Sequence, residues 1–508
     1  MSSMSHPKSM EASFESISAA EFFYRNRQMA GFGNPTQAVY STVRELVENS
    51  LDSCDDAQNY PMINIDIQNV NSDIISVIVS DNGTGVPPEQ VPFAFGRVLY
   101  GSKYSQQQKR GTFGLGVTMA ILYGQITTDS PVIIHTRTET SGGHLYRLLV
   151  DVENNLPLVE GEENCPRKEI GTTVTIQLKG DLKRSEERIV EYLRLSTLST
   201  PHAKITLRID EEIQLEIGGW SKTIPEPIRP AKPHPRSADM EVLRRLISKH
   251  EDRNLEDFLC KSFQKIGQRT ASRFLRFMNF DPSRIVSDLN RNEISNLARA
   301  LRKYDGFERP DSKCLSPIGK IEFLTAARSV FNVKVAEYAS LGVHEWQGNP
   351  FVMEAVIASG DDFPQSDIPM LHRFVNRVPL LYDASDGVLA RALKRVNWSR
   401  YNGKASEPAA IFLHLCSTKI PFKAAGKQSL ASIPEIEHYS YQLFRELGRK
   451  LGRIKVRSRK SAREMKKMRE FSKSLRQIAR FGSALAGCDD VPSTDEIVKQ
   501  LFEVGLDE

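Results

Sequence analysis

The sequence predicts a multidomain protein of mixed α/β and α+β class, and three observations support this prediction. The chain has 508 residues, which is too long for one ordinary domain and favours about three. Helix-like and strand-like patterns alternate as far as residue 228, which indicates a layered α/β domain. A proline-rich linker and an almost wholly helical stretch follow, and strands and helices then mix again before a helical end.

The first strong element is a helix that begins at Pro35. Asn34 is suited to cap this helix, proline is favoured in a first turn, and apolar residues recur at helical spacing from Val39 to Val47. Alternating apolar and polar residues predict further strands in the same domain. These segments read INIDIQNV, ISVIVS, VIIHTR, YRLLVDV and TTVTIQL.

Prolines mark the boundary after the first domain, because residues 223–237 contain five prolines among fifteen residues. Residues 239–305 then have helical periodicity, with a tight junction at Ile266 and Gly267. That junction suits either a DNA-binding motif or a structural spacer. Strands and helices mix from about 315 to 420, and the chain is helical and basic from about 434.

The composition indicates a soluble globular protein in a reducing compartment. The chain is 40% hydrophobic and 26% charged, with a net charge of +5. Its six cysteines lie far apart without a CxxC spacing, which favours neither a zinc ribbon nor a disulfide framework. No run of about 18 apolar residues is present, and the N-terminus lacks the apolar segment of a signal peptide. We expect a cytoplasmic protein.

Two stretches place carboxylates where they could serve a ligand. In RELVENSLD, Glu45 and Asn49 are four residues apart and share one face of the first helix, where they could activate water and hold a hard cation. A solvated acidic helix face is the alternative. In DNGTGV, Asp81 ends a strand and could accept the amine of a purine, while Gly83 and Gly85 let the backbone approach a flat ring. A plain turn is the alternative here.

Two further stretches suit phosphate binding. Residues 111–118, GTFGLGVT, form a glycine-rich loop at a helix N-terminus, where backbone N–H groups and the helix dipole attract anions. The stretch is neither a P-loop nor a dinucleotide fingerprint. Lys109 and Arg110 precede it and could close over phosphates as a lid, or belong to a polar surface loop. In IGTTVTIQL, Thr172 follows a glycine at the start of a strand, which also suits a hairpin turn.

Taken together and in this order, the four stretches resemble the ATP-binding fold shared by gyrase, the mismatch-repair ATPases and sensor histidine kinases. The resemblance extends to the B subunits of archaeal DNA topoisomerase VI. It rests on AEFFYRNRQMAGFGNPTQAVYSTVRELVENSLDS, PPEQVPFAFGRVLYGSKY, KPHP and HLCSTKIPFKAAGKQS. The family order implies a GHKL (Bergerat) ATPase α/β sandwich at 1–228 and a helix-two-turns-helix domain at 236–308. An α/β transducer domain at 309–470 and a C-terminal helical segment at 471–508, which docks the A subunit, complete the implied order.

The same resemblance implies roles for individual residues. Glu45 is similar to the general base, Asn49 to the Mg²⁺ ligand, and Asp81 to the adenine reader, with Gly85 keeping the ring edge accessible. Lys427 is similar to the transducer lysine that reaches the γ-phosphate. Lys419 and Lys423 are nearby candidates for the same role, and a basic surface loop is the alternative for all three. The lid and the phosphate-binding stretch comprise Ser102, Lys103, Gly111, Thr112, Phe113, Gly114, Leu115, Gly116, Val117 and Thr118, and Thr172 completes the nucleotide-binding set.

The function implied by the resemblance is that of the ATP-hydrolysing subunit of a type IIB DNA topoisomerase, an isomerase that uses ATP and Mg²⁺. Two B chains would dimerise on ATP and gate duplex DNA. A separate A subunit would cut DNA within an A2B2 heterotetramer, so that the complex relaxes and decatenates DNA at the archaeal nucleoid. A mismatch-repair-type ATPase and a non-enzymatic DNA-binding scaffold are the alternative interpretations.

Two regions outside the nucleotide motifs suit partners. Residues 445–480 carry 15 Lys and Arg against three Glu, which favours either a DNA contact or a solvated helix. Residues 493–506 predict a short amphipathic helix that could dock the A subunit or fold back on its own chain. The family's Trp-Lys-x-Tyr stretch reads Trp398-Ser399-Arg400-Tyr401 here, which leaves a DNA or interdomain role for it open.

Overall fold

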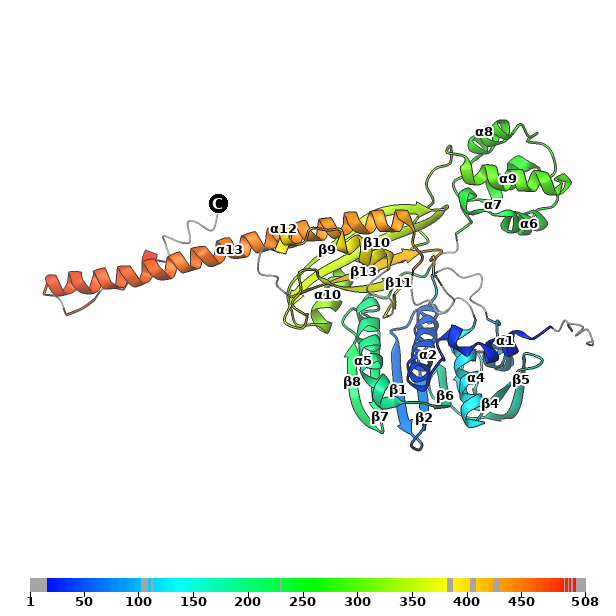
Figure 1. Ribbon diagram of the computed structural model, residues 1–508, viewed down its shortest axis with the longest axis horizontal. Helices are drawn as coiled ribbons and strands as arrows, with labels where there is room; N and C mark the ends of the chain where they lie inside the picture. The colour runs from blue at the N-terminus through cyan, green and yellow to red at the C-terminus, as the bar shows by residue number, and fades with distance from the viewer. Residues whose placement is uncertain are drawn as a thin grey trace, which may run out of the picture.

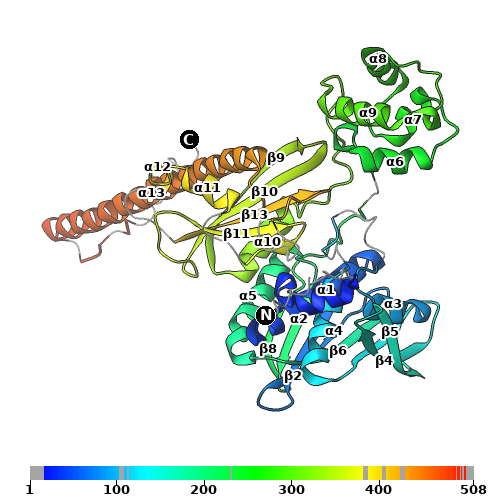
Figure 2. The ribbon, with the colours of Figure 1, turned by 45° about the vertical axis from the view of Figure 1, so that its right-hand side comes forward.

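The computed structural model describes residues 16–498 except for 102–107, 111–113, 229–230, 382–386, 403–407, 424–429, 488, 492 and 495–496. Two β-sheets, a group of short helices and one long helix make up this part of the chain (Figure 1). The helical group lies to one side of both sheets and contacts the second sheet through the ion pair of Arg236 with Glu345. The long helix extends away from the second sheet, as Figure 2 also shows from a different side.

An eight-stranded sheet forms the N-terminal domain, with the strand order β5-β4-β3-β6-β2-β1-β7-β8. Neighbouring strands are antiparallel except for β1 and β7, which run parallel. Helices α2, α4 and α5 pack against the sheet and bury its apolar residues in one core. The strands are β1 (Met62–Asn69), β2 (Ile74–Ser80), β3 (Val132–Arg137), β4 (Gly143–Asp151), β5 (Leu156–Asn164), β6 (Gly171–Lys179), β7 (Lys204–Ile209) and β8 (Glu212–Gly218), and the helices are α1 (Ala19–Arg25), η1 (Arg27–Ala30), α2 (Pro35–Ala57), η2 (Pro88–Gln90), α3 (Val91–Gly96), α4 (Gly116–Thr128) and α5 (Leu182–Ser199).

Helix α2 begins where the sequence predicted. The side chain of Asn34 accepts a hydrogen bond of 2.8 Å from the backbone N–H of Gln37, and Pro35 occupies the first turn. The five predicted strands correspond to β1, β2, β3, β4 and β6. Strands β5, β7 and β8 were not among the predicted strands, although the sequences KITLRI of β7 and EIQLEIG of β8 alternate apolar and polar residues. Strands β5 and β8 are edge strands of mostly exposed residues.

The helical domain follows the linker and confirms the helical periodicity of residues 239–305. Phe258, Phe263 and Phe274 are fully buried at its centre, and Tyr304 and Phe307 pack on Phe274 with ring centroids 5.2 Å from it. The helices are η4 (Pro235–Ser237), α6 (Met240–Ser248), α7 (Leu255–Ser262), α8 (Gln268–Met278), η5 (Val286–Asp288) and α9 (Arg291–Lys303).

A five-stranded sheet with the order β12-β11-β13-β10-β9 forms the second-sheet domain. The central strand β13 runs antiparallel to β10 and parallel to β11, and all its residues are buried. One apolar cluster joins this sheet to α11 and to the first turns of α13, and another joins it to α10 and to α5 of the N-terminal domain. The elements are α10 (Lys320–Val330), β9 (Val333–Trp346), β10 (Asn349–Gly360), β11 (Met370–Val375), β12 (Val378–Pro379), α11 (Val388–Lys394), α12 (Ser399–Asn402) and β13 (Ala409–Ser417).

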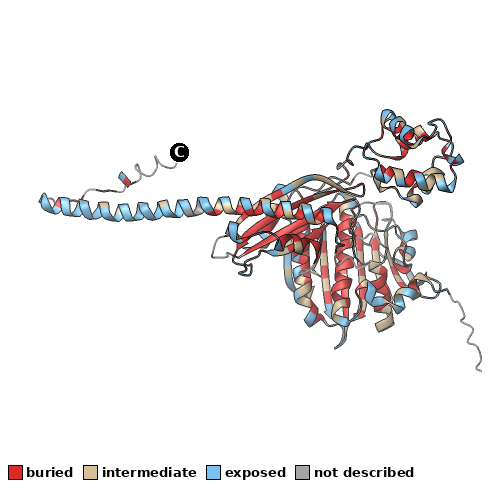
Figure 3. Cartoon of the chain, turned by 45° about the horizontal axis from the view of Figure 1, so that its top comes forward, coloured by how far each residue is buried: buried red, intermediate tan, exposed pale blue. Residues whose placement is uncertain are grey.

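Helix α13 (Pro434–Leu485) is 52 residues long and unbroken. Its beginning packs on the second sheet through the buried residues Leu443, Phe444, Leu447 and Leu451. Beyond residue 455 its described side chains are mostly exposed, as the pale blue helix of Figure 3 shows. In the described part of the chain, no helix has the length and apolar character required to cross a bilayer.

Candidate functional site

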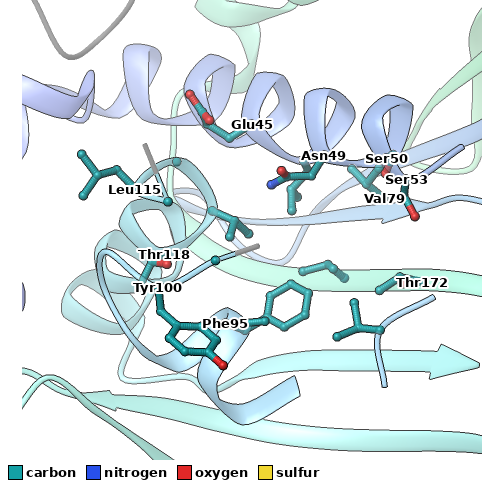
Figure 4. A pocket seen from close by; sticks show the side chains of 18 of the residues that line it. Glu45, Asn49, Ser50, Ser53, Val79, Phe95, Tyr100, Leu115, Thr118 and Thr172 are labelled. Carbon is teal, nitrogen blue, oxygen red and sulfur yellow. The ribbon is translucent and has the colours of Figure 1, made fainter. Parts of the chain in front are cut away.

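A cavity of about 660 Å³ opens in the N-terminal domain between α2, the first turn of α4 and the strands β2 and β6 (Figure 4). Its size lies in the usual range for small-molecule sites. Ten of the sixteen predicted site residues are described, and all ten line this cavity. They are Glu45, Asn49, Asp81, Gly85, Gly114, Leu115, Gly116, Val117, Thr118 and Thr172. The other six, which are Ser102, Lys103, Gly111, Thr112, Phe113 and Lys427, lie outside the described residues.

Helix α2 supplies one wall of the cavity. Glu45 and Asn49 lie one turn apart on the same face of this helix, as their spacing predicted (Figure 4). Glu45 is only 8% exposed, and the guanidinium of Arg44 donates a hydrogen bond to its carboxylate. The Nε atom of Arg44 lies 3.6 Å from the Glu48 carboxylate. Burial alone would lower the pKa of Arg44, but the carboxylates of Glu45 and Glu48 raise it above its ordinary value.

The pairing of Arg44 with Glu45 was not predicted. Adjacent residues on a helix point about 100° apart, so their contact depends on how the long arginine side chain folds back. The structure buries Arg44 between two carboxylates, and this cation therefore neutralises part of the negative charge of α2 beside the cavity. No periodicity or motif in the sequence signals such a contact.

Asp81 lies at the end of strand β2 and is fixed by three donors. Its carboxylate accepts hydrogen bonds from Ser50 Oγ at 2.9 Å and from the backbone N–H groups of Gly83 at 2.9 Å and Thr172 at 3.2 Å. Burial raises the pKa of Asp81, although these three donors oppose the increase. The side chain is thus an oriented, nearly desolvated acceptor at one end of the cavity.

Two glycines are required by their close neighbours. Gly85 has a left-handed φ of +70°, and a Cβ atom there would overlap the backbone carbonyl of Arg137. The fold therefore demands glycine at 85 whatever the position does for a ligand. Gly116 begins α4, and a Cβ atom at this position would overlap the Glu45 carboxylate. The missing side chain lets the N-terminus of α4 approach the acid of α2.

Lys109 and Arg110, which could close over phosphates, bond to acidic residues of α2 in the structure, and their contact with phosphates stays a prediction. Lys109 bonds to Asp56, and Arg110 bonds to Asp52 at 3.2 Å and to Asp55 at 2.6 Å, so both cations are held at the C-terminal end of α2. Neither residue lines the cavity. The acidic end of α2 neutralises them because a buried guanidinium is stable only when it is paired.

Several further residues line the cavity although no role was assigned to them from the sequence. Phe23, Met29 and Ala30 come from α1 and η1, ahead of the four nucleotide-binding stretches. Tyr100 donates a hydrogen bond of 2.8 Å to Gln90, and both belong to the lining. These contacts arise from tertiary packing, which the local pattern of α1 and η1 does not predict.

Two lysines and an aromatic stretch that the sequence analysis singled out in the second-sheet domain lie outside this cavity. Lys419 and Lys423 are exposed and are not part of the lining. Trp398 is 3% exposed and its indole N–H donates to the carbonyl of Leu393 at 3.0 Å. Tyr401 packs on Trp398 and fits against Gly448 of α13. Both aromatic rings therefore serve the packing of α13 on this domain.

The fold and the cavity together define a nucleotide-binding domain of the gyrase and HSP90 class. Residues 34–182 match the family described as histidine kinase-, DNA gyrase B- and HSP90-like ATPase. Residues 310–468 match the family described as topoisomerase VI B subunit, transducer. The second match distinguishes the chain from a mismatch-repair-type ATPase, which was the main alternative.

Relatives that are similar over nearly the whole length identify the particular family. The B subunit of type 2 DNA topoisomerase 6 from Saccharolobus islandicus strain Y.N.15.51 is 36% identical over 479 residues, which is 93% of this chain and 90% of that protein. The protein of the same name from Pyrobaculum aerophilum is 34% identical over 471 residues, or 92% and 89% of the two chains. The chain belongs to the family of type 2 DNA topoisomerase 6 B subunits, and it is an ATP-binding member of the type IIB class.

Similarity to solved structures is weaker. The N-terminal domain of a DNA repair protein covers 84% of this chain and 98% of its own, at 13% identity and a TM-score of 0.43. The Aquifex aeolicus MutL ATPase domain complexed with ADP covers 81% and 96%, at 13% identity and a TM-score of 0.34. The family assignment rests on the sequence relatives and the two family matches.

Proposed function

We propose that this chain binds ATP with Mg²⁺ in the cavity of the N-terminal domain and hydrolyses it to drive duplex DNA passage by a topoisomerase complex. One observation carries the proposal: two carboxylates with different surroundings line the same cavity. Asp81 is a fixed, desolvated acceptor, whereas Glu45 faces the glycine that begins α4. This arrangement suits a ligand with an amine at one end and phosphates at the other.

Each group has a role that follows from its chemistry. Asp81 would accept the exocyclic amine of adenine, because its carboxylate is oriented and has lost its hydration. The N-terminus of α4 would attract the phosphates, since its backbone N–H groups lack partners within the helix and the dipole favours anions. Glu45 would accept a proton from the attacking water.

Asn49 fits the role of a magnesium ligand. Mg²⁺ takes one or two protein oxygens and completes its shell with phosphates and water, and the amide of Asn49 lies on the cavity wall one helical turn from Glu45. The ion, when bound, would neutralise the charge of the phosphates. Gly114, Leu115, Val117 and Thr118 would line the phosphate end, with Thr172 beside Asp81.

Residues outside the described part would complete the site. We assign Ser102 and Lys103 to the lid, Gly111, Thr112 and Phe113 to the phosphate-binding stretch, and Lys427 to a contact with the γ-phosphate. A lysine in the second-sheet domain would connect ATP occupancy to the orientation of that domain, because its attraction is lost when the phosphate leaves. The proposed domains are an ATPase domain at 1–228, a helix-two-turns-helix domain at 236–308, a transducer at 309–470 and a docking segment at 471–508.

The partners follow from the family and from α13. We propose that two B chains dimerise on ATP and join two DNA-cleaving A subunits in an A2B2 complex that acts on double-stranded DNA in the cytoplasm, at the nucleoid. The distal part of α13 supports the docking segment. Phe471, Ile478 and Leu485 recur every seven residues and are 40%, 66% and 90% exposed, as a helix that packs against another helix requires.

The experiment that tests the proposal compares Glu45→Gln with the unchanged chain. Loss of the base should lower kcat for ATP hydrolysis by at least about 100-fold while nucleotide affinity stays within about threefold, since Glu45 acts on water rather than on the ligand. Glu187→Gln, at an exposed position of α5, is the matched control. Phosphate release by Glu45→Gln at the rate of this control would refute the assignment.

A further inference from the structure

Gln108 lies buried at the contact between the N-terminal domain and the second-sheet domain. Its side chain is only 9% exposed, although it belongs to a loop. The amide oxygen accepts hydrogen bonds from the backbone N–H of Ser316 at 3.0 Å and from the thiol of Cys416 at 2.8 Å. The amide nitrogen donates to the carbonyl of Cys314. One glutamine of the first domain therefore satisfies three groups of the other domain.

The backbone around Gln108 is fixed rather than loosely seated. Gln108 has a left-handed φ of 59°, a conformation that is unfavourable for a residue with a Cβ atom and persists only where its surroundings hold it. Arg110, two residues on, is tied to Asp52 and Asp55, and its guanidinium also donates to Thr200 Oγ1 at 3.1 Å. Lys109 is tied to Asp56. The two residues that follow Gln108 therefore attach this part of the loop to α2.

Charge interactions strengthen the attachment of this loop to α2. Burial alone would raise the pKa of Asp55, but the guanidinium of Arg110, a bond to His202 and the charge of Arg377 lower it well below the usual range. Arg377 belongs to the second-sheet domain, in the turn between β11 and β12. Its carbonyl accepts a hydrogen bond of 2.6 Å from Ser199 at the end of α5. A second contact therefore crosses the same domain boundary.

Residues 314–319, which include two of the groups bonded to Gln108, are also bonded to the second sheet. Glu354 of strand β10 accepts hydrogen bonds from the backbone N–H groups of Ile318 at 2.6 Å and Gly319 at 3.1 Å. The same carboxylate bonds to His414 of β13 at 2.8 Å, and the other ring nitrogen of His414 accepts the N–H of Arg377 at 3.0 Å. Residues 314–319 are thus held from one side by Gln108 and from the other by the centre of the sheet.

We propose that Gln108 is a positioning residue that transmits the position of helix α2 to the transducer, in addition to any contact made by Lys427. Helix α2 carries Glu45 and Asn49 at the cavity and Asp52 and Asp55 at its far end. A shift of this helix when nucleotide binds would move Arg110, then Gln108, and then residues 314–319 with the sheet behind them. The inference rests on the proposed nucleotide site. It concerns the contacts through which a movement of α2 reaches the second sheet, and not the chemistry of ATP hydrolysis.

The test measures hydrogen exchange at single amides in the full chain, with and without a non-hydrolysable ATP analogue. Gln108→Met keeps the length of the side chain and removes its hydrogen bonds. Without nucleotide, the Ser316 amide should exchange roughly fivefold faster in this variant, the factor that corresponds to one ordinary hydrogen bond. The amides of Ile318 and Gly319 bond to Glu354 and serve as an internal reference. Gln214→Met, on the exposed face of β8, is the matched control.

The response to nucleotide shows whether Gln108 transmits the position of α2 or only stabilises the contact between the domains. The analogue should change Ser316 exchange in the unchanged chain and in Gln214→Met but not in Gln108→Met, although all three bind the analogue equally. In a complex with the A subunit, Gln108→Met should keep its ATP turnover within about twofold and consume more ATP for each duplex passed. Gln108→Asn, whose shorter side chain cannot span the contact, should behave in the same way and replaces Gln108→Met if that variant does not fold.

An equal response of Ser316 to the analogue in the variant and in the unchanged chain would overturn the inference. The inference would also be overturned if the analogue binds the parent chain, as a direct binding measurement shows, and the exchange rate of the Ser316 amide does not change. Failure of the proposed function gives a different result, because the unchanged chain would then bind no analogue at all.

Discussion

Gly116 shows how a single missing side chain shapes the candidate site. The position begins α4 and faces the carboxylate of Glu45 so closely that even a methyl group would overlap it. A backbone N–H of α4 and a carboxylate of α2 can therefore lie on opposite sides of one small space. Glycine at 116 is a requirement of the Glu45 position as well as of the loop.

Gly116→Ala should lower kcat for ATP hydrolysis by about tenfold or more, because the added methyl group displaces Glu45 and misplacement of a reacting group by about 1 Å can cost 100-fold. Steady-state phosphate release measures this effect. Gly142→Ala is the control, since a Cβ atom there meets no atom of the described residues within 4 Å. Wild-type turnover in Gly116→Ala would mean that Glu45 does not act from the position described.

At the residue scale, the sequence predicted the members of the cavity better than their partners. Glu45, Asn49 and Asp81 were found from helical spacing and from a strand end, which are local properties of the chain. The contact of Arg44 with Glu45 and the bonds of Arg110 to Asp52 and Asp55 depend on tertiary packing. For Lys109 and Arg110 the sequence left a phosphate lid and a polar surface loop open, and it did not indicate their bonds to α2.

At the scale of single elements, strand β11 carries a buried histidine with a consequence for stability. His372 is 9% exposed, and its ring stacks on Phe412 of β13 with centroids 5.0 Å apart. Burial, assisted by the charge of Arg373, lowers the pKa of His372 to about 4. The native chain therefore keeps this ring neutral in a pH range in which the unfolded chain protonates it.

The free energy of unfolding should fall as the pH decreases from about 6.5, the ordinary histidine pKa, to about 4, and His372 should account for about 3 kcal/mol of that loss. The sign follows because the unfolded state binds the extra proton in this window. His372→Phe keeps an aromatic ring on Phe412 and removes the titrating group, so its stability should depend less steeply on pH. Chemical denaturation at several pH values measures the difference, and equal slopes for the two chains would contradict the prediction.

Element type was predictable where the pattern was long and regular. The cap at Asn34 and the alternation in β1 and β6 placed these elements correctly. Strands β7 and β8 were missed although their apolar and polar residues alternate, and β8 lies at an edge of the sheet with most of its residues exposed. The predicted helix at 493–506 lies largely outside the described residues.

At the scale of the whole molecule, the basic helix α13 is the main candidate for a DNA surface. Arg457, Lys460 and Lys467 are exposed on its projecting part. Replacing all three by Glu should weaken duplex DNA binding and reduce the slope of log K against log salt by about 3, because each lost phosphate contact removes about 0.9. Titrations at several salt concentrations measure both effects.

The matched control reverses three exposed lysines of the N-terminal domain, which are Lys168, Lys183 and Lys222. It changes the net charge of the protein by the same amount but leaves α13 intact. An identical salt slope in the α13 variant and the unchanged chain would show that the projecting helix is only solvated.

The arrangement of the domains could not be predicted from the sequence. Domain order followed from the linker prolines and the change in periodicity, but the contact between the two domains combines the apolar cluster around α5 and α10 with buried polar groups such as Gln108, Ser199 and Arg377. Such residues look like ordinary loop residues in a sequence. Only packing shows that they bond across a boundary.

The length of α13 gives small rotations a large effect. The helix rises about 1.5 Å per residue, so the thirty residues from 456 to 485 extend about 45 Å beyond the packed base. A tilt of about ten degrees at that base would carry the tip through about 8 Å, as a lever does. A rotation of that size at the packed base would thus open or close a gap that is wide compared with a side chain.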